Sequence, residues 1–204
     1  MKTIVDRVSE FVTDKRLLDI GIVGNPSNPC SQYKLRSKLA RKSFGIDIDK
    51  MGIERARNQG LDNVYCYDIC NVSHVVDFYY SVLKQKKFDV ITATEILEHV
   101  LCFQTFFSNL KFLLAEQGRI FITTVNAFSV RFFAKKLSGR LKVNPEHTCW
   151  FDEITLVQLV EQCGFRVWEV FYAVPPSVEE LARLGIKKSE DWMSKKVGVI
   201  AVRG

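Results

Sequence analysis

Four acidic residues recur at the ends of short apolar segments in the first half of the chain: Asp19, Asp47, Asp68 and Glu95. A hydrophobic core does not require a carboxylate at four successive segment ends, so a shared polar ligand is the economical explanation. The Asp47 carboxylate can accept charge-assisted hydrogen bonds from both hydroxyls of a ribose, and the Asp68 carboxylate can accept a hydrogen bond from an adenine amino group. Asp47 could instead be a turn or capping residue, a role for which Asp49 is better placed.

The turn after Asp19 restricts the kind of ligand. Gly21 allows the backbone to approach a ligand closely, although a purely structural turn explains this glycine equally well. The dinucleotide-binding pattern G-x-G-x-x-G is absent, because from Gly21 its register falls on Val23 and Pro26, and there is no P-loop. An acidic strand end would repel a pyrophosphate, whereas it suits a cationic sulfonium nucleoside.

The apolar segments that carry these residues are rich in β-branched side chains and alternate with helical patterns. Such alternation is typical of parallel strands joined by right-handed crossovers. The predicted strands are residues 16–20, 43–48, 64–68, 88–93, 118–124, 165–172 and 197–202. Only a short helical stretch near 177–185 precedes the last strand. We therefore expect a Rossmann-like, doubly wound α/β fold, with a mostly parallel seven-stranded sheet whose last strand is antiparallel.

Capping residues mark two of the helices between these strands. Asp49 is a candidate N-cap for a helix over 50–59 that stops at Gly60, because glycine tolerates a positive φ. Asp152 can cap a later helix that ends at Gly164.

The length and composition of the chain suit a single domain over residues 1–204. Its hydrophobic fraction of 47% and charged fraction of 25% are ordinary for a globular protein with one core. The net charge of +6 can favour phosphates or anionic headgroups, although a solvated basic surface explains it as well. The N-terminus has no apolar signal core and no window approaches 18 uninterrupted apolar residues, so we expect an intracellular, cytoplasmic protein.

The cysteines do not indicate a metal centre. None of the six forms a C-x-x-C pair, and the spacing of Cys66 and Cys70 lacks a matching second pair or a nearby histidine. The sequence therefore predicts free thiols and no metal site.

The longest interruption of the pattern is the stretch 126–150, after the fifth predicted strand. Residues 127–142 combine aromatic side chains with lysines and arginines, and Gly139 is expected to break a helix there. The phenylalanines expected to share one helical face are Phe128, Phe132 and Phe133. One interpretation is a helix packed on the domain with a solvated basic side. The other is a lid over an acceptor pocket, whose aromatics cover an apolar acceptor and whose cations contact a phosphate or a membrane surface.

Five motifs, taken in order, resemble those of class I S-adenosylmethionine-dependent methyltransferases. They are LLDIG at 17–21, GIDID at 45–49, the Asp68-Ile69 step, FDVITATEILEHV at 88–100 and LLAEQGRIFITT at 113–124. Further along, EHTCWF at 146–151 and CGF at 163–165 resemble the C-terminal half of the ubiquinone-biosynthesis O-methyltransferase group. The resemblance covers roughly residues 15–172.

The resemblance implies S-adenosyl-L-methionine as cofactor and suggests which residues bind it. Asp19 and Gly21 would shape the loop on the methionine side. Asp47 would bind the ribose, while Asp68 and Ile69 would flank the adenine.

The glycine loop departs from the pattern D-x-G-x-G-x-G that is common in the family. Val23 and Asn25 stand at the second and third glycine places, and Gly24 is out of register. The departure bears on the conformation of the loop and on the affinity for the cofactor.

The sulfonium already carries an activated methyl group, so the protein contributes to methyl transfer mainly by aligning the acceptor with that group. By the resemblance, Glu95 lies beside the reactive centre. A base near an acceptor hydroxyl would add a factor of ~10² to 10⁴. His147 is the favoured candidate base, with His99 as second choice, although His147 could instead bond the turn before the helix that Asp152 caps.

We therefore predict an enzyme that transfers a methyl group to a small-molecule acceptor, at an oxygen, with lipid-like or sugar-containing molecules as the classes to consider. A nucleic-acid methyltransferase is the first alternative, and TATEIL at 92–97 in place of a [DN]-P-P-[YF] motif counts against it. A module that binds the cofactor without catalysis is the second, because of the altered glycine loop. The sequence indicates no oligomeric state.

Overall fold

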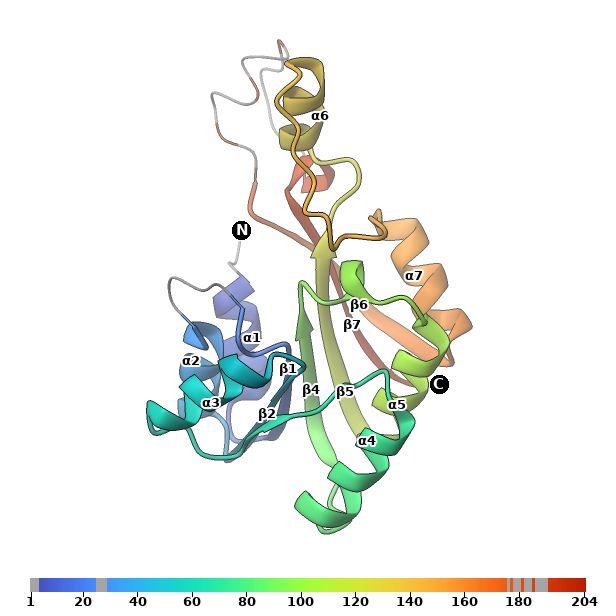
Figure 1. The fold of residues 1–204 in the computed structure, drawn as a ribbon. Helices are drawn as coiled ribbons and strands as arrows, with labels where there is room; N and C mark the ends of the chain where they lie inside the picture. The colour runs from blue at the N-terminus through green and yellow to red at the C-terminus, as the bar shows by residue number, and fades with distance from the viewer. Residues whose placement is uncertain (1–3, 25–28, 176, 178–180, 182–184, 186–190) are drawn as a thin grey trace.

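The computed structural model describes residues 4–24, 29–175, 177, 181, 185 and 191–204. Seven strands form one sheet in the order β3-β2-β1-β4-β5-β7-β6 (Figure 1). The strands are β1 (Arg16–Ile20), β2 (Lys42–Asp47), β3 (Val64–Cys66), β4 (Phe88–Thr94), β5 (Leu114–Val125), β6 (Phe165–Ala173) and β7 (Lys196–Arg203). Strands β1 to β5 pair in parallel, and β7 runs antiparallel between β5 and β6. The predicted sheet, with its antiparallel last strand, is confirmed.

Helices cover both faces of this sheet. They are α1 (Ile4–Val12), α2 (Ser31–Leu39), α3 (Lys50–Asn58), α4 (Val72–Asp77), which continues as the π-helical turn η1 (Phe78–Val82), the 3-10 turn η2 (Leu97–His99), α5 (Phe103–Leu113), α6 (Val130–Leu137), α7 (Glu153–Gln162) and the 3-10 turn η3 (Asp191–Met193). Most of the stretch 177–185, where a short helix is predicted, lies outside the described residues. No helix in the described ranges is long and apolar enough to cross a membrane.

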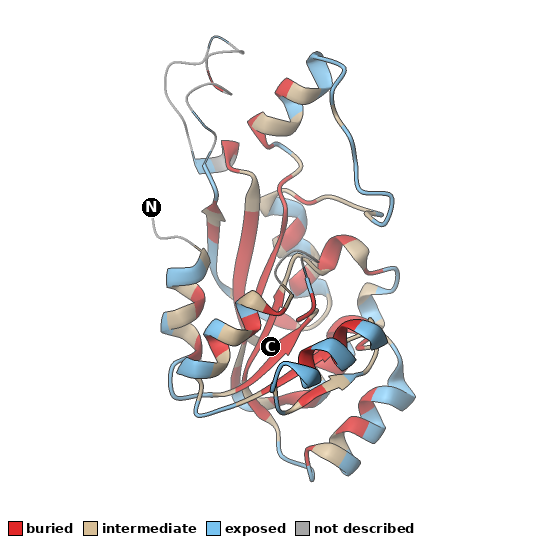
Figure 2. Ribbon diagram, turned by 60° about the vertical axis from the view of Figure 1, so that its left-hand side comes forward, coloured by how far each residue is buried: buried red, intermediate tan, exposed pale blue. Residues whose placement is uncertain are grey.

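The two helical layers follow from the alternation of side chains along each strand, because successive residues point to opposite faces. Leu18 and Ile91 belong to the large cluster that includes residues of α4, α5 and α7. Their neighbours Leu17 and Val90 pack instead with Val8 of α1 on the other face. Figure 2 shows the result, in which the strands are mostly buried and the helices keep exposed outer surfaces.

Both predicted caps are present. The Asp49 side chain accepts a hydrogen bond from the Gly52 backbone N–H at 2.9 Å at the start of α3. Asp152 begins α7 with a capping box in which Thr155 is the reciprocal partner. The glycine expected after the latter helix, Gly164, has a φ of 81°. These local signals were readable because each involves residues only a few positions apart.

Two strand boundaries differ from the prediction by more than one residue. Strand β5 begins at Leu114, earlier than expected, and β3 ends at Cys66 rather than at residue 68. The chain leaves β3 early because the Asp68 carboxylate accepts a hydrogen bond from the Cys70 N–H at 2.8 Å and its carbonyl accepts one from the Asn71 N–H at 3.1 Å. These bonds form a turn that competes with the strand.

The segment after β5 leaves the sheet at its carboxyl edge, and Figure 1 shows α6 standing beyond the end of β5. Gly139 follows the helix with a φ of 66°, as predicted. The expected shared face of three phenylalanines is wrong, because Phe128 precedes the helix and Phe132 stacks on Trp150 with ring centroids 5.0 Å apart. Phe133 remains 60% exposed.

Candidate active site

The turn after β1 is held against the end of β2 by Asp47. This last residue of β2 accepts hydrogen bonds from the Val23 N–H at 2.8 Å and from the Asp49 N–H at 2.9 Å, one on each carboxylate oxygen. Asp47 is half-buried. Because a carboxylate offers about four acceptor positions, two such bonds leave capacity for the hydroxyls of a ligand.

Gly21 begins this turn in a conformation that excludes other residues. Its φ is +73°, and a Cβ atom there would lie 2.0 Å from Cδ1 of Ile96. Its N–H donates to the carbonyl of Ile46 at 2.9 Å. Gly24 also has a positive φ, of 57°, but a Cβ there would meet nothing within 4 Å. Asn25, at the third glycine place of the family pattern, lies outside the described residues.

Asp19 has a different environment from the other three acidic residues. It is buried, and its Oδ1 accepts hydrogen bonds of 2.7 Å from both the Arg36 guanidinium and the Thr92 hydroxyl. Arg36, also buried, donates a second bond of 3.2 Å to the Thr94 hydroxyl. This ion pair joins β1, α2 and β4 beneath the turn.

Asp68 and Ile69 lie beyond the end of β3. The Asp68 N–H donates to Nδ1 of His74 at 3.2 Å, and the half-buried carboxylate accepts a hydrogen bond from the Cys70 N–H. Ile69 is 5% exposed, and its carbonyl accepts a hydrogen bond of 2.7 Å from the buried Asn109 side chain. The backbone here is thus fixed to α4 and α5.

Glu95 directly follows β4 with a φ of 59°, in the left-handed region that non-glycine residues rarely adopt. Its N–H donates to the Thr123 carbonyl at 2.8 Å, and its carboxylate contacts the ammonium group of Lys196. Burial and the nearby Arg36 guanidinium lower the pKa of Lys196 to about 8. The Glu95 contact acts in the opposite direction, but the Glu95 side chain is 43% exposed, so solvent screens its charge and the burial of Lys196 dominates.

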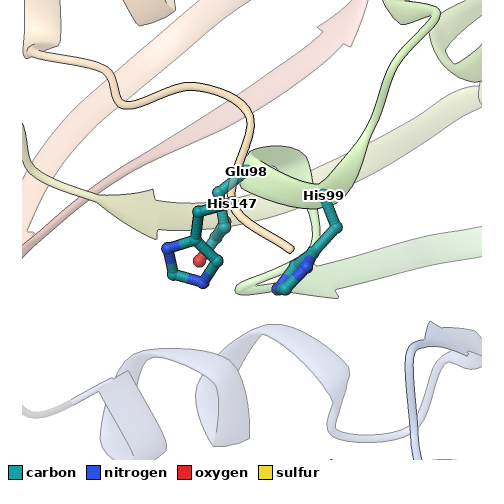
Figure 3. Close-up of side chains that lie close together, drawn as sticks. All are labelled: Glu98, His99 and His147. Carbon is teal, nitrogen blue, oxygen red and sulfur yellow. The ribbon is translucent and has the colours of Figure 1, made fainter. Parts of the chain in front are cut away.

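A second cluster, consisting of Glu98, His99 and His147, lies close by. Glu98 and His99 belong to η2, whereas His147 comes from the segment that follows α6 (Figure 3). The imidazole rings of His99 and His147 lie 4.7 Å apart at an angle of 87°. Glu98 is 1% exposed and accepts a hydrogen bond of 2.7 Å from the Thr124 hydroxyl.

The electrostatics of this cluster are set by its burial. Burial raises the pKa of Glu98, while the Thr124 hydrogen bond opposes that shift. Burial, reinforced by His99, lowers the pKa of His147. The backbone brings the two segments together, because the Thr148 N–H donates to the Glu98 carbonyl at 2.9 Å.

Three of these residues were missed by sequence reasoning: Arg36, Lys196 and Glu98. The signal for Arg36 was the aspartate within the buried strand β1, because a fully buried carboxylate requires a cationic or hydrogen-bonding partner. Glu98 stands within the motif FDVITATEILEHV, but its partner His147 is 49 residues further along. No local spacing pattern joins such residues.

Comparison with known proteins identifies the family. A family model described as a methyltransferase domain matches residues 1–170. The ubiquinone biosynthesis O-methyltransferase of Glaesserella parasuis is 31% identical over 160 residues, which cover 76% of this chain and 65% of the relative. That of Pasteurella multocida is 27% identical over 166 residues, which cover 74% and 64%. This chain therefore spans just under two thirds of the length of these relatives.

Solved structures share the fold at low sequence identity. A methyltransferase from Thermotoga maritima superimposes with a TM-score of 0.68 at 13% identity, over 98% of this chain and 87% of the other. One from Archaeoglobus fulgidus has a TM-score of 0.64 at 18% identity, over 97% and 92%. The N-methyltransferase NodS from Bradyrhizobium japonicum, in complex with S-adenosyl-L-homocysteine, has a TM-score of 0.59 at 16% identity, over 98% and 83%.

The family match over residues 1–170, together with the strand order and the curated relatives, shows that this chain belongs to the class I S-adenosylmethionine-dependent methyltransferases, enzymes whose cofactor is S-adenosyl-L-methionine.

Proposed function

We propose that this chain binds S-adenosyl-L-methionine across the carboxyl ends of β1, β2 and β4 and transfers its methyl group to an oxygen atom of a small molecule. The observation that carries the proposal is the series of partly exposed carboxylates at or just beyond the carboxyl ends of β2, β3 and β4, at Asp47, Asp68 and Glu95. The names of the curated relatives, both O-methyltransferases, support oxygen as the acceptor atom.

The residues present fit the nucleoside half of the cofactor. The Asp47 carboxylate keeps acceptor capacity beyond its two backbone hydrogen bonds and would accept hydrogen bonds from the ribose hydroxyls. Asp68 would accept the adenine amino group, and the neighbouring Ile69 would supply an apolar contact to the ring. Gly21 lets the backbone of the turn come close to the methionine side of the ligand.

Asp19 acts indirectly in this account. Its carboxylate is already used by Arg36 and Thr92, so it serves to orient the Arg36 guanidinium beneath the turn. We propose that the pair stabilises the turn that carries Gly21, so that Asp19 shapes the loop through Arg36.

The bound cofactor supplies an activated methyl group, and the chain supplies alignment. Glu95 lies at the reactive centre, where its strained backbone and its contact with Lys196 fix the direction of the carboxylate. In this proposal His147, in the segment that follows α6, takes the proton that an acceptor hydroxyl loses.

We further propose that residues 127–142 form a lid over a lipid-like acceptor. Phe128, Phe133 and Leu137 are all at least 60% exposed, beside the cations of Lys135 and Lys136. Val130 anchors the base of the helix by packing with Leu181 and Met193. An apolar acceptor with an anionic group, or a membrane surface, would match this combination.

Labelled methyl groups provide the test of the function. The protein is incubated with S-adenosylmethionine labelled in its methyl group and with cell extract, and the label is followed into lipid, sugar, small-molecule, protein and RNA fractions. We expect the label in an ether-linked methyl group of a lipid, sugar or other small molecule. Label in RNA or protein, or in an amine of a small molecule, would contradict the proposal.

Hydrogen exchange tests the lid. Amides of α6 should exchange quickly in the free protein and slow down when cofactor and an acceptor are bound. Helix α5, which is packed in the core, is the internal reference. Uniformly slow exchange over 127–142, unchanged by ligands, would leave α6 a purely structural helix.

A further inference from the structure

The turn between β3 and α4 carries Asp68, the carboxylate that we place at the adenine. The pairing of β3 with β2 ends at Cys66, and the Tyr67 N–H makes the last bond between them, to the Asp47 carbonyl at 3.1 Å. Because β3 is an edge strand, the next N–H along the chain, that of Asp68, has no strand to donate to. A backbone N–H in this position requires another acceptor.

His74, in the first turn of α4, supplies that acceptor. Its Nδ1 accepts a hydrogen bond from the Asp68 N–H at 3.2 Å. The backbone N–H of His74 donates to Oδ1 of Asn71, the N-cap of α4, at 3.2 Å. The Asn71 N–H in turn donates to the Asp68 carbonyl at 3.1 Å. Three hydrogen bonds thus form a closed ring that joins the turn to the start of the helix.

The imidazole of His74 is supported by a neighbouring aromatic ring. It packs edge-on against Tyr67, with ring centroids 6.0 Å apart at an angle of 74°. The Tyr67 ring packs on the buried Phe78 with centroids 5.1 Å apart, and its hydroxyl donates to the Asp77 carboxylate. These contacts favour the orientation in which Nδ1 faces the Asp68 N–H, although His74 itself is exposed.

The ring of hydrogen bonds fixes the backbone of Asp68 on both sides. With its N–H held by His74 and its carbonyl held by Asn71, the direction of its Cα–Cβ bond is set. Its carboxylate accepts the Cys70 N–H at 2.8 Å on Oδ1. Because a carboxylate offers about four acceptor positions, capacity remains for a donor on a ligand.

We propose that His74 is a positioning residue for base recognition: by accepting the Asp68 N–H, it directs the Asp68 carboxylate at the adenine amino group. This inference rests on the proposed cofactor site. Without an acceptor at position 74, the Asp68 N–H turns to solvent and the carboxylate loses its fixed direction. The protein should then distinguish adenine less well from a base that carries an oxygen in place of the amino group, because that oxygen has no hydrogen to donate.

Calorimetry with two ligands tests this role. S-inosylhomocysteine differs from S-adenosylhomocysteine in that an oxygen replaces the amino group of the base. We expect the wild type to prefer S-adenosylhomocysteine. In His74→Leu its affinity should fall by about 3- to 10-fold, the range that the loss of one hydrogen bond accounts for, whereas the affinity for S-inosylhomocysteine should stay within a factor of about 2.

Two further variants separate this role from a general effect on α4. His74→Asn places a side-chain oxygen near the position of Nδ1, where it can accept the Asp68 N–H, and should restore the preference for S-adenosylhomocysteine. Ser73→Leu adds the same side chain as His74→Leu at the neighbouring exposed position and should bind both ligands like the wild type.

The ratio of the two affinities decides the outcome. An unchanged ratio in His74→Leu, whether both affinities fall or neither does, would overturn the role of His74. No recovery in His74→Asn, or the same loss in Ser73→Leu, would also overturn it. A wild type that binds neither ligand would instead contradict the proposed function, and this inference with it.

Discussion

The cofactor side and the acceptor side of this molecule are built in different ways. On the cofactor side, the Asp47 and Asp68 carboxylates each accept a hydrogen bond from a backbone N–H two residues further along the chain, at Asp49 and Cys70. Beyond β4 and β5, each side chain lies beside a residue from a distant part of the chain. Glu95 contacts Lys196, and Glu98 lies beside His147. The first region offers a preformed set of acceptors for a nucleoside. The second depends on how the segment after α6 and the start of β7 return to the sheet.

The largest effect should come from the ion pair beneath the cofactor side. Asp19→Ala leaves the Arg36 guanidinium buried without its partner, and we expect a loss of about 3–5 kcal/mol in the free energy of unfolding. Arg41→Ala, which breaks the exposed pair with Asp89 and leaves Asp89 bonded to the Arg16 N–H, should cost less than about 1 kcal/mol. Urea unfolding measures both. Similar losses for the two variants would show that the buried pair does not hold β1 and α2 together.

The glycine turn should show a smaller and more local effect. Gly21→Ala and Gly24→Ala both place a side chain at positive φ, at a cost of about 1–2 kcal/mol each. Only Gly21→Ala also displaces Ile96, which adjoins Glu95. We therefore expect Gly21→Ala to weaken S-adenosylhomocysteine binding more strongly than Gly24→Ala does, as measured by calorimetry. A larger loss of affinity in Gly24→Ala would show that the contact between Gly21 and Ile96 does not affect ligand binding.

The contrast between the two regions also explains how much could be read from the sequence. The strands, the caps at Asp49 and Asp152 and the order of the acidic residues depend on local patterns, so the sheet and its carboxyl edge were predictable. The partner of Asp19 was not, because Arg36 lies on a basic helix that resembles a solvated surface. The approach of His147 to Glu98 was also unreadable, since it depends on the path of the whole segment after β5.

Lys196 should contribute a pH dependence to the stability of the protein. Its pKa is about 8 in the folded chain, lowered from the ordinary 10.5 by burial and by Arg36. Between these two values the unfolded chain binds more protons, so the free energy of unfolding should rise with pH. From pH 8 to 10.5, the free energy of unfolding of the wild type should rise by no more than about 3 kcal/mol relative to that of Lys196→Met, whose side chain does not titrate. The Glu95 contact makes the rise smaller. Urea unfolding of both proteins across this range measures the gain, and a constant difference would show that Lys196 is not perturbed.

Titration with S-adenosylhomocysteine in a calorimeter tests the central claim, that the carboxyl edge of β1, β2 and β4 is a nucleoside site. The wild type should bind at micromolar affinity, about −8 kcal/mol. Asp47→Ala should bind ~10- to 150-fold more weakly, because it loses charge-assisted contacts to the ribose, while Asp62→Ala, at an exposed position, should bind normally. Absence of binding by the folded wild type, or unchanged affinity in Asp47→Ala, would contradict the account.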